Sequence, residues 1–158
     1  LIRMFNQQDM GTLTNDNFVF ETELKNPFSY GSNPCQFVQV LIQGKDDIMI
    51  IPLSARACVG DISLYAYGQG VESKHGDLSG FGCDLSDWVK LRVESKNKHI
   101  RFFVNGRNAY ELDFPNEPTG IVGVQLRFWG PASVRGTRFE SADSNYHLSP
   151  RPRQLSLK

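Results

Sequence analysis

Three segments of the sequence place aromatic or hydrogen-bonding side chains at every second position, a spacing that puts them on one side of a β-strand. The aromatic rings offer faces on which a sugar ring can stack, and the amide and guanidinium groups offer hydrogen bonds to its hydroxyls. We expect these side chains to line one concave face and to bind a ligand there. They are Tyr65 and Tyr67, then Gln39 and Gln43, and finally Gln125, Arg127 and Trp129.

The outward direction of the two tyrosines depends on Ile62, Leu64 and Ala66 facing the core. The glycine-rich stretch 68–82 follows them without any periodicity, which predicts a long surface loop. This loop gives the alternative interpretation, because it could cover both tyrosines and Trp129 and leave no binding surface.

The remaining reactive residue types do not form a catalytic or metal-binding pattern. The histidines at 75, 99 and 147 have no zinc spacing and no Ser or Cys partner nearby in the sequence. Cys83 precedes Asp84, whose negative charge disfavours a reactive thiolate. Glu21 and Glu23 share one strand face, where we expect them to be solvated surface charges.

The positions of these residues depend on an all-β fold, since period-2 segments bounded by turn residues repeat along the chain and no helical period is sustained. Asn105-Gly106 is a strong hairpin signal, because both central residues of a type I′ turn need positive φ. The apolar run 48–51 suits a strand covered on both faces or one at a sheet crossover. About nine strands are expected, at 18–24, 35–43, 48–51, 61–67, 89–94, 100–104, 109–114, 121–128 and 134–139. This pattern predicts a two-sheet antiparallel β-sandwich.

Length and composition agree with one globular domain. The chain has 158 residues, 40% hydrophobic and 22% charged, with 17 basic and 17 acidic residues and a formal net charge of zero. Zero net charge disfavours a nucleic-acid partner, and no apolar run is long enough for membrane insertion. We expect the domain to cover 1–140 and a C-terminal tail to cover 141–158, which is rich in proline and basic residues at its end. Because the chain does not begin with Met, we expect either a domain of a longer protein or a processed product.

Three cysteines, at 35, 58 and 83, permit at most one disulfide bond. A Cys35–Cys58 bond would join two loop ends, as in many extracytoplasmic sandwiches. The alternative is three reduced, buried thiols.

Motifs between 87 and 139 are more particular than those of a generic sandwich. They are Asp-Trp-Val-Lys-Leu-Arg-Val-Glu at 87–94, Ile-Arg-Phe-Phe-Val-Asn-Gly at 100–106 and Gly-Ile-Val-Gly-Val-Gln-Leu-Arg-Phe-Trp-Gly at 120–130. Together with Asn-Phe-Val-Phe-Glu-Thr-Glu-Leu at 17–24, this order resembles the concanavalin A-like lectin/glucanase superfamily, with laminin-G-like domains as the nearest branch. The resemblance implies a jelly-roll sandwich in which Trp88 packs in the core between the sheets.

The resemblance also raises the question of catalysis. Glucanases of this superfamily carry Glu-x-Asp-x-x-Glu on one strand, with two carboxyl groups about 5 Å apart. Glu111 and Asp113 are similar to its first part, but Glu117 stands one residue too far along and Pro115 interrupts the strand. The sequence therefore favours a protein that is not an enzyme.

Calcium sites in laminin-G-like domains combine loop aspartates with backbone carbonyls. Asp61, Asp77 and Asp84 are the residues here that would act as such ligands, although their spacing matches no EF-hand. No cofactor is otherwise expected.

Our main hypothesis is a non-catalytic, carbohydrate-binding or accessory module of a larger extracytoplasmic protein, either secreted, periplasmic or on the cell surface. A laminin-G-like domain that binds a protein partner is one alternative. A glycoside hydrolase or lyase is the other.

Overall fold

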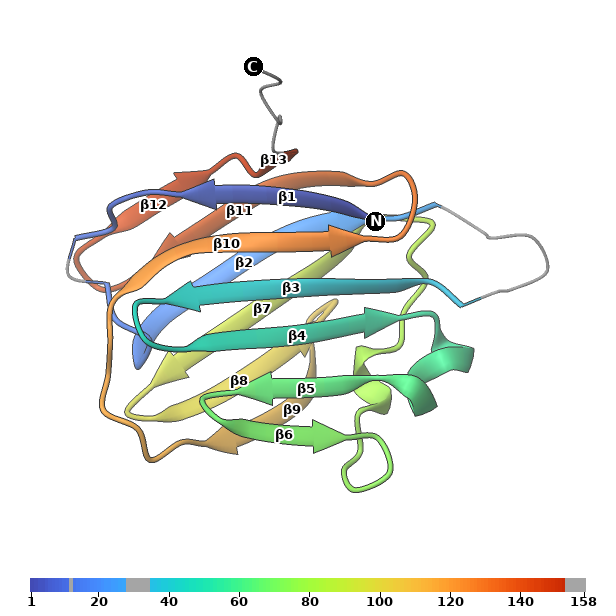
Figure 1. Ribbon diagram of the computed structural model, residues 1–158, viewed down its shortest axis with the longest axis horizontal. Coiled ribbons are helices and arrows are strands. Elements are labelled where there is room, and N and C mark those ends of the chain that lie inside the picture. Colours follow the sequence, from blue (N-terminus) through green and yellow to red (C-terminus); the bar gives the residue numbers. More distant parts are fainter. Residues whose placement is uncertain (12, 28–34, 153–158) are drawn as a thin grey trace, which may run out of the picture.

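Two antiparallel β-sheets packed face to face form the protein (Figure 1). The computed structural model describes residues 1–11, 13–27 and 35–152. The seven-stranded sheet has the order β13-β1-β10-β3-β4-β5-β6, and the six-stranded sheet has the order β12-β11-β2-β7-β8-β9. The strands are β1 (Ile2–Gln7), β2 (Asn17–Lys25), β3 (Phe37–Gly44), β4 (Ile48–Ser54), β5 (Ser63–Ala66), β6 (Gln69–Glu72), β7 (Val89–Lys96), β8 (His99–Val104), β9 (Arg107–Asp113), β10 (Ile121–Phe128), β11 (Ser133–Glu140), β12 (Asn145–Leu148) and β13 (Arg151–Pro152). Two 3-10 helices, η1 (Arg56–Asp61) and η2 (Ser79–Phe81), complete the fold.

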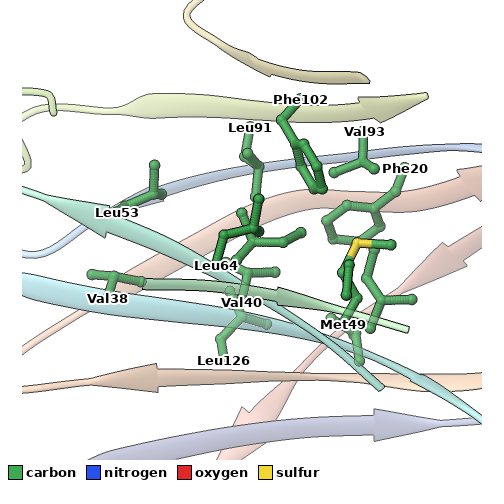
Figure 2. Packing of buried hydrophobic residues seen from close by; sticks show 14 of the residues in the cluster. Phe20, Val38, Val40, Met49, Leu53, Leu64, Leu91, Val93, Phe102 and Leu126 are labelled. Atoms are coloured by element: carbon green, nitrogen blue, oxygen red, sulfur yellow. The ribbon is translucent and has the colours of Figure 1, made fainter. Parts of the chain in front are cut away.

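The core lies between the sheets and is built from the alternating apolar positions of their strands. Side chains of β3, β4, β5 and β10 face side chains of β2, β7 and β8 (Figure 2). Since a strand turns successive side chains to opposite faces, the same alternation leaves the other half of each strand on an outer face. The core residues labelled in Figure 2 are Phe20, Val38, Val40, Met49, Leu53, Leu64, Leu91, Val93, Phe102 and Leu126.

This arrangement confirms the predicted two-sheet antiparallel sandwich. β3 to β6 follow one another as neighbours in one sheet and β7 to β9 in the other, while the connections before and after β2 and before and after β10 pass from one sheet to the other, as in a jelly roll. The turn between β8 and β9 has φ of 50° at Asn105 and 81° at Gly106, as the Asn-Gly signal predicted. The apolar run of β4 lies in the interior of its sheet, with Ile48 and Ile50 half-buried on the outer face.

Several elements differ from the sequence-based expectation. The stretch 68–82 is not a plain surface loop, because it holds β6 and η2, and Leu78 and Phe81 are buried in the core. β1 was not expected. The segment 141–152, expected as part of a tail, contributes β12, which pairs with β11, and β13, which pairs with β1. The rest of the expected tail, 153–158, lies outside the described residues. No helix in the described ranges is long and apolar enough to cross a bilayer.

The predicted core position of Trp88 is wrong. Val89, Leu91 and Val93 point into the core, so the preceding Trp88 belongs to the outer face of the six-stranded sheet and is half-buried there. The guanidinium carbon of Arg135 lies 3.8 Å from its ring centroid and the Lys25 ammonium nitrogen 4.9 Å from it. Cation–π contacts thus replace the inter-sheet packing that the family pattern implied.

The expectation of a solvated Glu21 is also wrong. Its side chain is only 9% exposed, because long cationic side chains from β7 and β11 lie over it. Lys90 Nζ lies 2.8 Å from one carboxylate oxygen, Arg138 Nη2 lies 2.9 Å from the other, and Arg92 also donates to the latter. Burial alone would raise the pKa of Glu21, but the hydrogen bonds from Lys90 and Arg92 and the charge of Arg138 lower it below its ordinary value.

Replacing Glu21 by glutamine is expected to lower the free energy of unfolding by about 2 kcal/mol at neutral pH, since three cations lose their shared carboxylate. The lowered pKa means that this contribution is complete above pH 4.5 and is lost as the pH falls through the folded-state value. Urea unfolding of the wild-type and Glu21→Gln proteins across this pH range tests the prediction. A difference in unfolding free energy that stays constant into strong acid would contradict the lowered pKa of Glu21. Glu23→Gln is the control, because Glu23 is more exposed and forms an ion pair with one cation, Arg135, among the described residues.

A buried asparagine joins the two sheets at the end where β3 turns into β4. Asn15, 2% exposed, donates from Nδ2 to Asp47 Oδ2 at 2.8 Å and accepts the Thr119 backbone N–H at 3.1 Å. Its backbone carbonyl accepts the hydroxyls of Tyr67, at 3.1 Å, and Ser95, at 2.6 Å. The segment before β2 is thereby fixed to both sheets and to the connection that leads into β10.

Of the two alternatives left open for the cysteines, the structure has the disulfide bond between Cys35 and Cys58, with Cα atoms 5.7 Å apart. It ties η1 to the segment that leads into β3. Cys83 is free and buried, and burial raises the pKa of its thiol to about 12. The thiol is therefore protonated at neutral pH, in agreement with the expectation that it is not a nucleophile.

Candidate functional site

The outer face of the seven-stranded sheet brings together most of the predicted ligand-binding residues. The register of β10 with β3 places Arg127 opposite Gln39 and Gln125 opposite Leu41. The next pairs place Gln39 opposite Pro52 on β4, and Ile50 of β4 opposite Tyr65 on β5. Two parallel rows of side chains therefore cross the sheet from β10 towards β5, the strands that run side by side in Figure 1.

The predicted residues differ in how far they reach the surface. Trp129 and Tyr65 are exposed, by 44% and 39%, and offer aromatic faces to solvent. Gln39 and Arg127 are half-buried. Gln125 is 5% exposed and contributes little surface. Gln43 lies on the same face towards the other end of β3, where its Oε1 accepts from Gln7 Nε2 at 3.4 Å.

Tyr67 does not belong to this face, so its predicted outward direction is wrong. β5 ends at Ala66, and Tyr67 and Gly68 form a turn with φ of 52° and 80°. The turn sends the tyrosine ring inward, where it stacks on Phe114 with ring centroids 4.1 Å apart and is 4% exposed. Burial raises the pKa of its hydroxyl well above the ordinary value. Tyr67 is thus a structural residue.

A groove of about 390 Å³ lies at one end of this face. Its lining includes Trp129, Gln39 and Pro52, together with Asp61 at the end of η1 and Ser63 at the start of β5. We call it the Trp129 groove. An exposed indole beside an amide, a hydroxyl and a carboxylate is a set that can stack on a sugar ring and hydrogen-bond to its hydroxyls.

Sequence reasoning missed part of this groove. Phe37 and Ser63 were not predicted to be site residues, and Asp61 was considered only as a calcium ligand. The alternation on β3 and β5 could have indicated Phe37 and Ser63, because Phe37 shares a face with Gln39 and Ser63 shares one with Tyr65. Nothing in the local sequence indicates that η1 carries Asp61 to the same place, since that requires the fold.

The aspartates considered for calcium do not lie together. Asp77 accepts hydrogen bonds from the backbone and hydroxyl of Ser79, and Asp84 accepts the same pair from Ser86, so each closes its own turn. These bonds lower the pKa of both carboxyl groups. Within the described ranges, no group of three or more His, Cys, Asp or Glu side chains could hold a metal ion.

The carboxylates considered for catalysis are held in ion pairs or lie in solvent. Glu111 pairs with Arg101 at 3.2 Å and with His99 at 3.4 Å, and Asp113 pairs with the same histidine at 2.7 Å. Glu117 lies beyond β9 with its side chain 92% exposed. These residues belong to the six-stranded sheet or its loops, away from the Trp129 groove.

A second, wider groove of about 670 Å³ lies on the six-stranded sheet. Its charged lining includes Glu94, Lys96, His99 and Arg101. The one aromatic side chain of its lining besides His99 is Phe18, which is 2% exposed and packs in the core. This groove therefore offers no aromatic face for stacking.

Comparison with known proteins shows the fold. No family model matches the chain, and no curated protein matches its sequence significantly. Among solved structures, it is similar to the carbohydrate binding module CBM66 from Bacillus subtilis, with 10% identity and a TM-score of 0.56 over 89% of this chain and 83% of that one. It is also similar to the galectin LEC-6 of Caenorhabditis elegans, with 13% identity and a TM-score of 0.54 over 86% and 95% of the two chains. A tetrameric galectin from the ball sponge Cinachyrella sp. gives 12% identity and a TM-score of 0.53 over 88% and 98%. The chain has the predicted concanavalin A-like jelly-roll fold.

Proposed function

We propose that this chain is a non-catalytic carbohydrate-binding module and that the Trp129 groove holds the sugar. The observation that carries the proposal is the exposed indole of Trp129 beside Gln39, Asp61 and Ser63 in one groove. Stacking on the indole would supply most of the affinity, and the polar groups would fix the orientation of the ring. Two of the similar structures are a carbohydrate binding module and a galectin by name, which supports this ligand class for the fold.

The proposed location is outside the cytoplasm. The Cys35–Cys58 disulfide bond supports it, because such bonds persist in oxidising compartments and are rare in the cytosol.

Replacing Trp129 by alanine is expected to lower affinity for the bound glycan at least about tenfold, since the stacking surface is lost. The glycan is first identified on an array with the purified protein, and affinities are then measured by calorimetry. Trp88→Ala is the matched control, because it removes the other tryptophan from the opposite sheet. Tyr65→Ala tests whether the site extends across β5.

The outcomes separate the proposal from its alternatives. Equal losses in both tryptophan variants, or no glycan bound at all, would contradict the proposal and favour a protein partner. Release of reducing ends from a polysaccharide by the wild-type protein would contradict the proposal that the module is non-catalytic. Repeating the array with a chelator tests whether glycan binding depends on calcium. Loss of binding in the presence of the chelator would mean that the site includes a metal ion.

A further inference from the structure

Charge is unevenly divided between the two outer faces. The ten ion pairs found among the described residues all lie on the six-stranded sheet or in its loops. Of the strands of the seven-stranded sheet, β13, β1, β10, β3, β4 and β5 carry three arginines and no acidic residue. These are Arg3, Arg127 and Arg151. We propose that the glycan bound at this face is anionic and that Arg127 receives its carboxylate or sulfate group.

The register brings two of these arginines together. Arg3 on β1 lies directly opposite Arg127 on β10. Like charges in directly opposite positions are destabilising, and no carboxylate in the described part of the chain pairs with either guanidinium. Arg151 lies opposite Phe5, which shares a face with Arg3, so the third charge is on the same side of the sheet. An anion between these groups would relieve their repulsion.

The hydrogen bonding of Arg127 leaves capacity for a ligand. Its Nη1 donates to Gln39 Oε1 at a long 3.4 Å, and its buried Nε has no acceptor among the described residues. Because this Nε is buried, a ligand on the outer face would bind the terminal Nη atoms of the guanidinium and not Nε. A guanidinium offers planar paired donors that match a carboxylate or sulfate group, with strong charge-assisted bonds.

The position of Arg127 beside the Trp129 groove connects this charge to the sugar. Trp129 comes directly after the end of β10, two residues along the chain from Arg127, so a ring stacked on Trp129 would carry its substituents near Arg127. Gln39 lines the groove and also accepts from Arg127. Asp61 also lines the groove, and its negative charge would favour an orientation of the glycan that places the anionic group at Arg127 and away from Asp61.

This inference rests on the proposed function, and the experiment separates the two. The array contains neutral, uronate-containing and sulfated glycans, together with the carboxyl-reduced or desulfated counterpart of each acidic one. We expect the hits to be acidic glycans and their neutralised counterparts to bind at least about tenfold more weakly. Arg127→Gln is expected to cause a similar loss of affinity for the acidic glycan without lowering the thermal midpoint of the free protein, since it removes one of two facing like charges.

Arg107→Gln is the matched control, because it removes the same charge from an exposed position on β9 of the other sheet. Arg127→Lys keeps the charge without the planar pair of donors and should recover only part of the affinity. Binding of neutral glycans that Trp129→Ala abolishes and Arg127→Gln leaves intact would overturn this inference and keep the proposed function. Equal losses in the two glutamine variants would also overturn it, and absence of any glycan binding would overturn both.

Discussion

Asn15→Ala is expected to lower the free energy of unfolding by about 3–5 kcal/mol, the largest effect of any single substitution considered. The change removes the Nδ2 donor from Asp47 and the Oδ1 acceptor from the Thr119 backbone N–H; Asn15 is buried and the two partners are half-buried. A buried group left without its partner costs more than the net value of the hydrogen bond. Chemical denaturation at neutral pH measures the loss.

The carboxyl group of Asp47 gives this prediction a pH signature. Burial raises its pKa, and the hydrogen bonds from Thr119 and Asn15 counteract that rise only in part. Without Asn15 the pKa should rise further. The folded state then holds a proton that the unfolded chain releases as the pH rises above 3.8, so the variant loses more stability at neutral pH than in acid. A loss independent of pH would contradict the role given to Asp47. Asn17→Ala, at an exposed position nearby, should change stability by less than about 0.5 kcal/mol.

The second large effect is expected from the disulfide bond. Cys35 and Cys58 are 23 residues apart in sequence, and closing a loop of that length contributes roughly 3 kcal/mol by restricting the unfolded chain. The double variant Cys35→Ser/Cys58→Ser should unfold at correspondingly lower urea concentration. A reducing agent should bring the wild-type protein to the same midpoint and leave the double variant unchanged.

The same bond should also matter for the ligand. Cys58 lies in η1, whose last residue, Asp61, lines the Trp129 groove, and Cys35 is two residues before Phe37, which also lines it. Without the bond, these two parts of the groove are less restrained, so glycan affinity should fall under conditions where the protein is still folded. An affinity that is unchanged in the folded double variant would show that the groove does not depend on this restraint.

The sequence was most informative where a strand has one buried face. Val89, Leu91 and Val93 alternate with charged residues, and the structure places them in the core as predicted. The same alternation places Trp88 on the outer face, whereas the family pattern implies a core position; the structure follows the local alternation. The predicted outward direction of Tyr67 is wrong for another reason. A turn with positive φ ends the strand one residue earlier, and a tyrosine gives no local sign of such a turn.

Contacts between distant strands set the limit of the sequence prediction. The position of Glu21 on an outer face was correct, yet its burial depends on Arg138, 117 residues away, and on Lys90 and Arg92 of a third strand. In the same way, Gln39 and Arg127 could be placed on one face from their own strands, but their proximity depends on the pairing of β3 with β10. Such registers depend on the whole sandwich.

The buried Cys83 makes the reversibility of unfolding depend on pH. In the folded protein its protonated thiol cannot attack the disulfide bond, because exchange requires a thiolate. Once the chain unfolds, the thiol returns to an ordinary pKa near 8.5 and can exchange with Cys35 or Cys58. Chains heated in mildly alkaline solution would therefore accumulate mispaired disulfides that cannot refold, whereas chains unfolded in acid would keep the native pairing. The core thus protects the correct disulfide isomer as long as the protein remains folded.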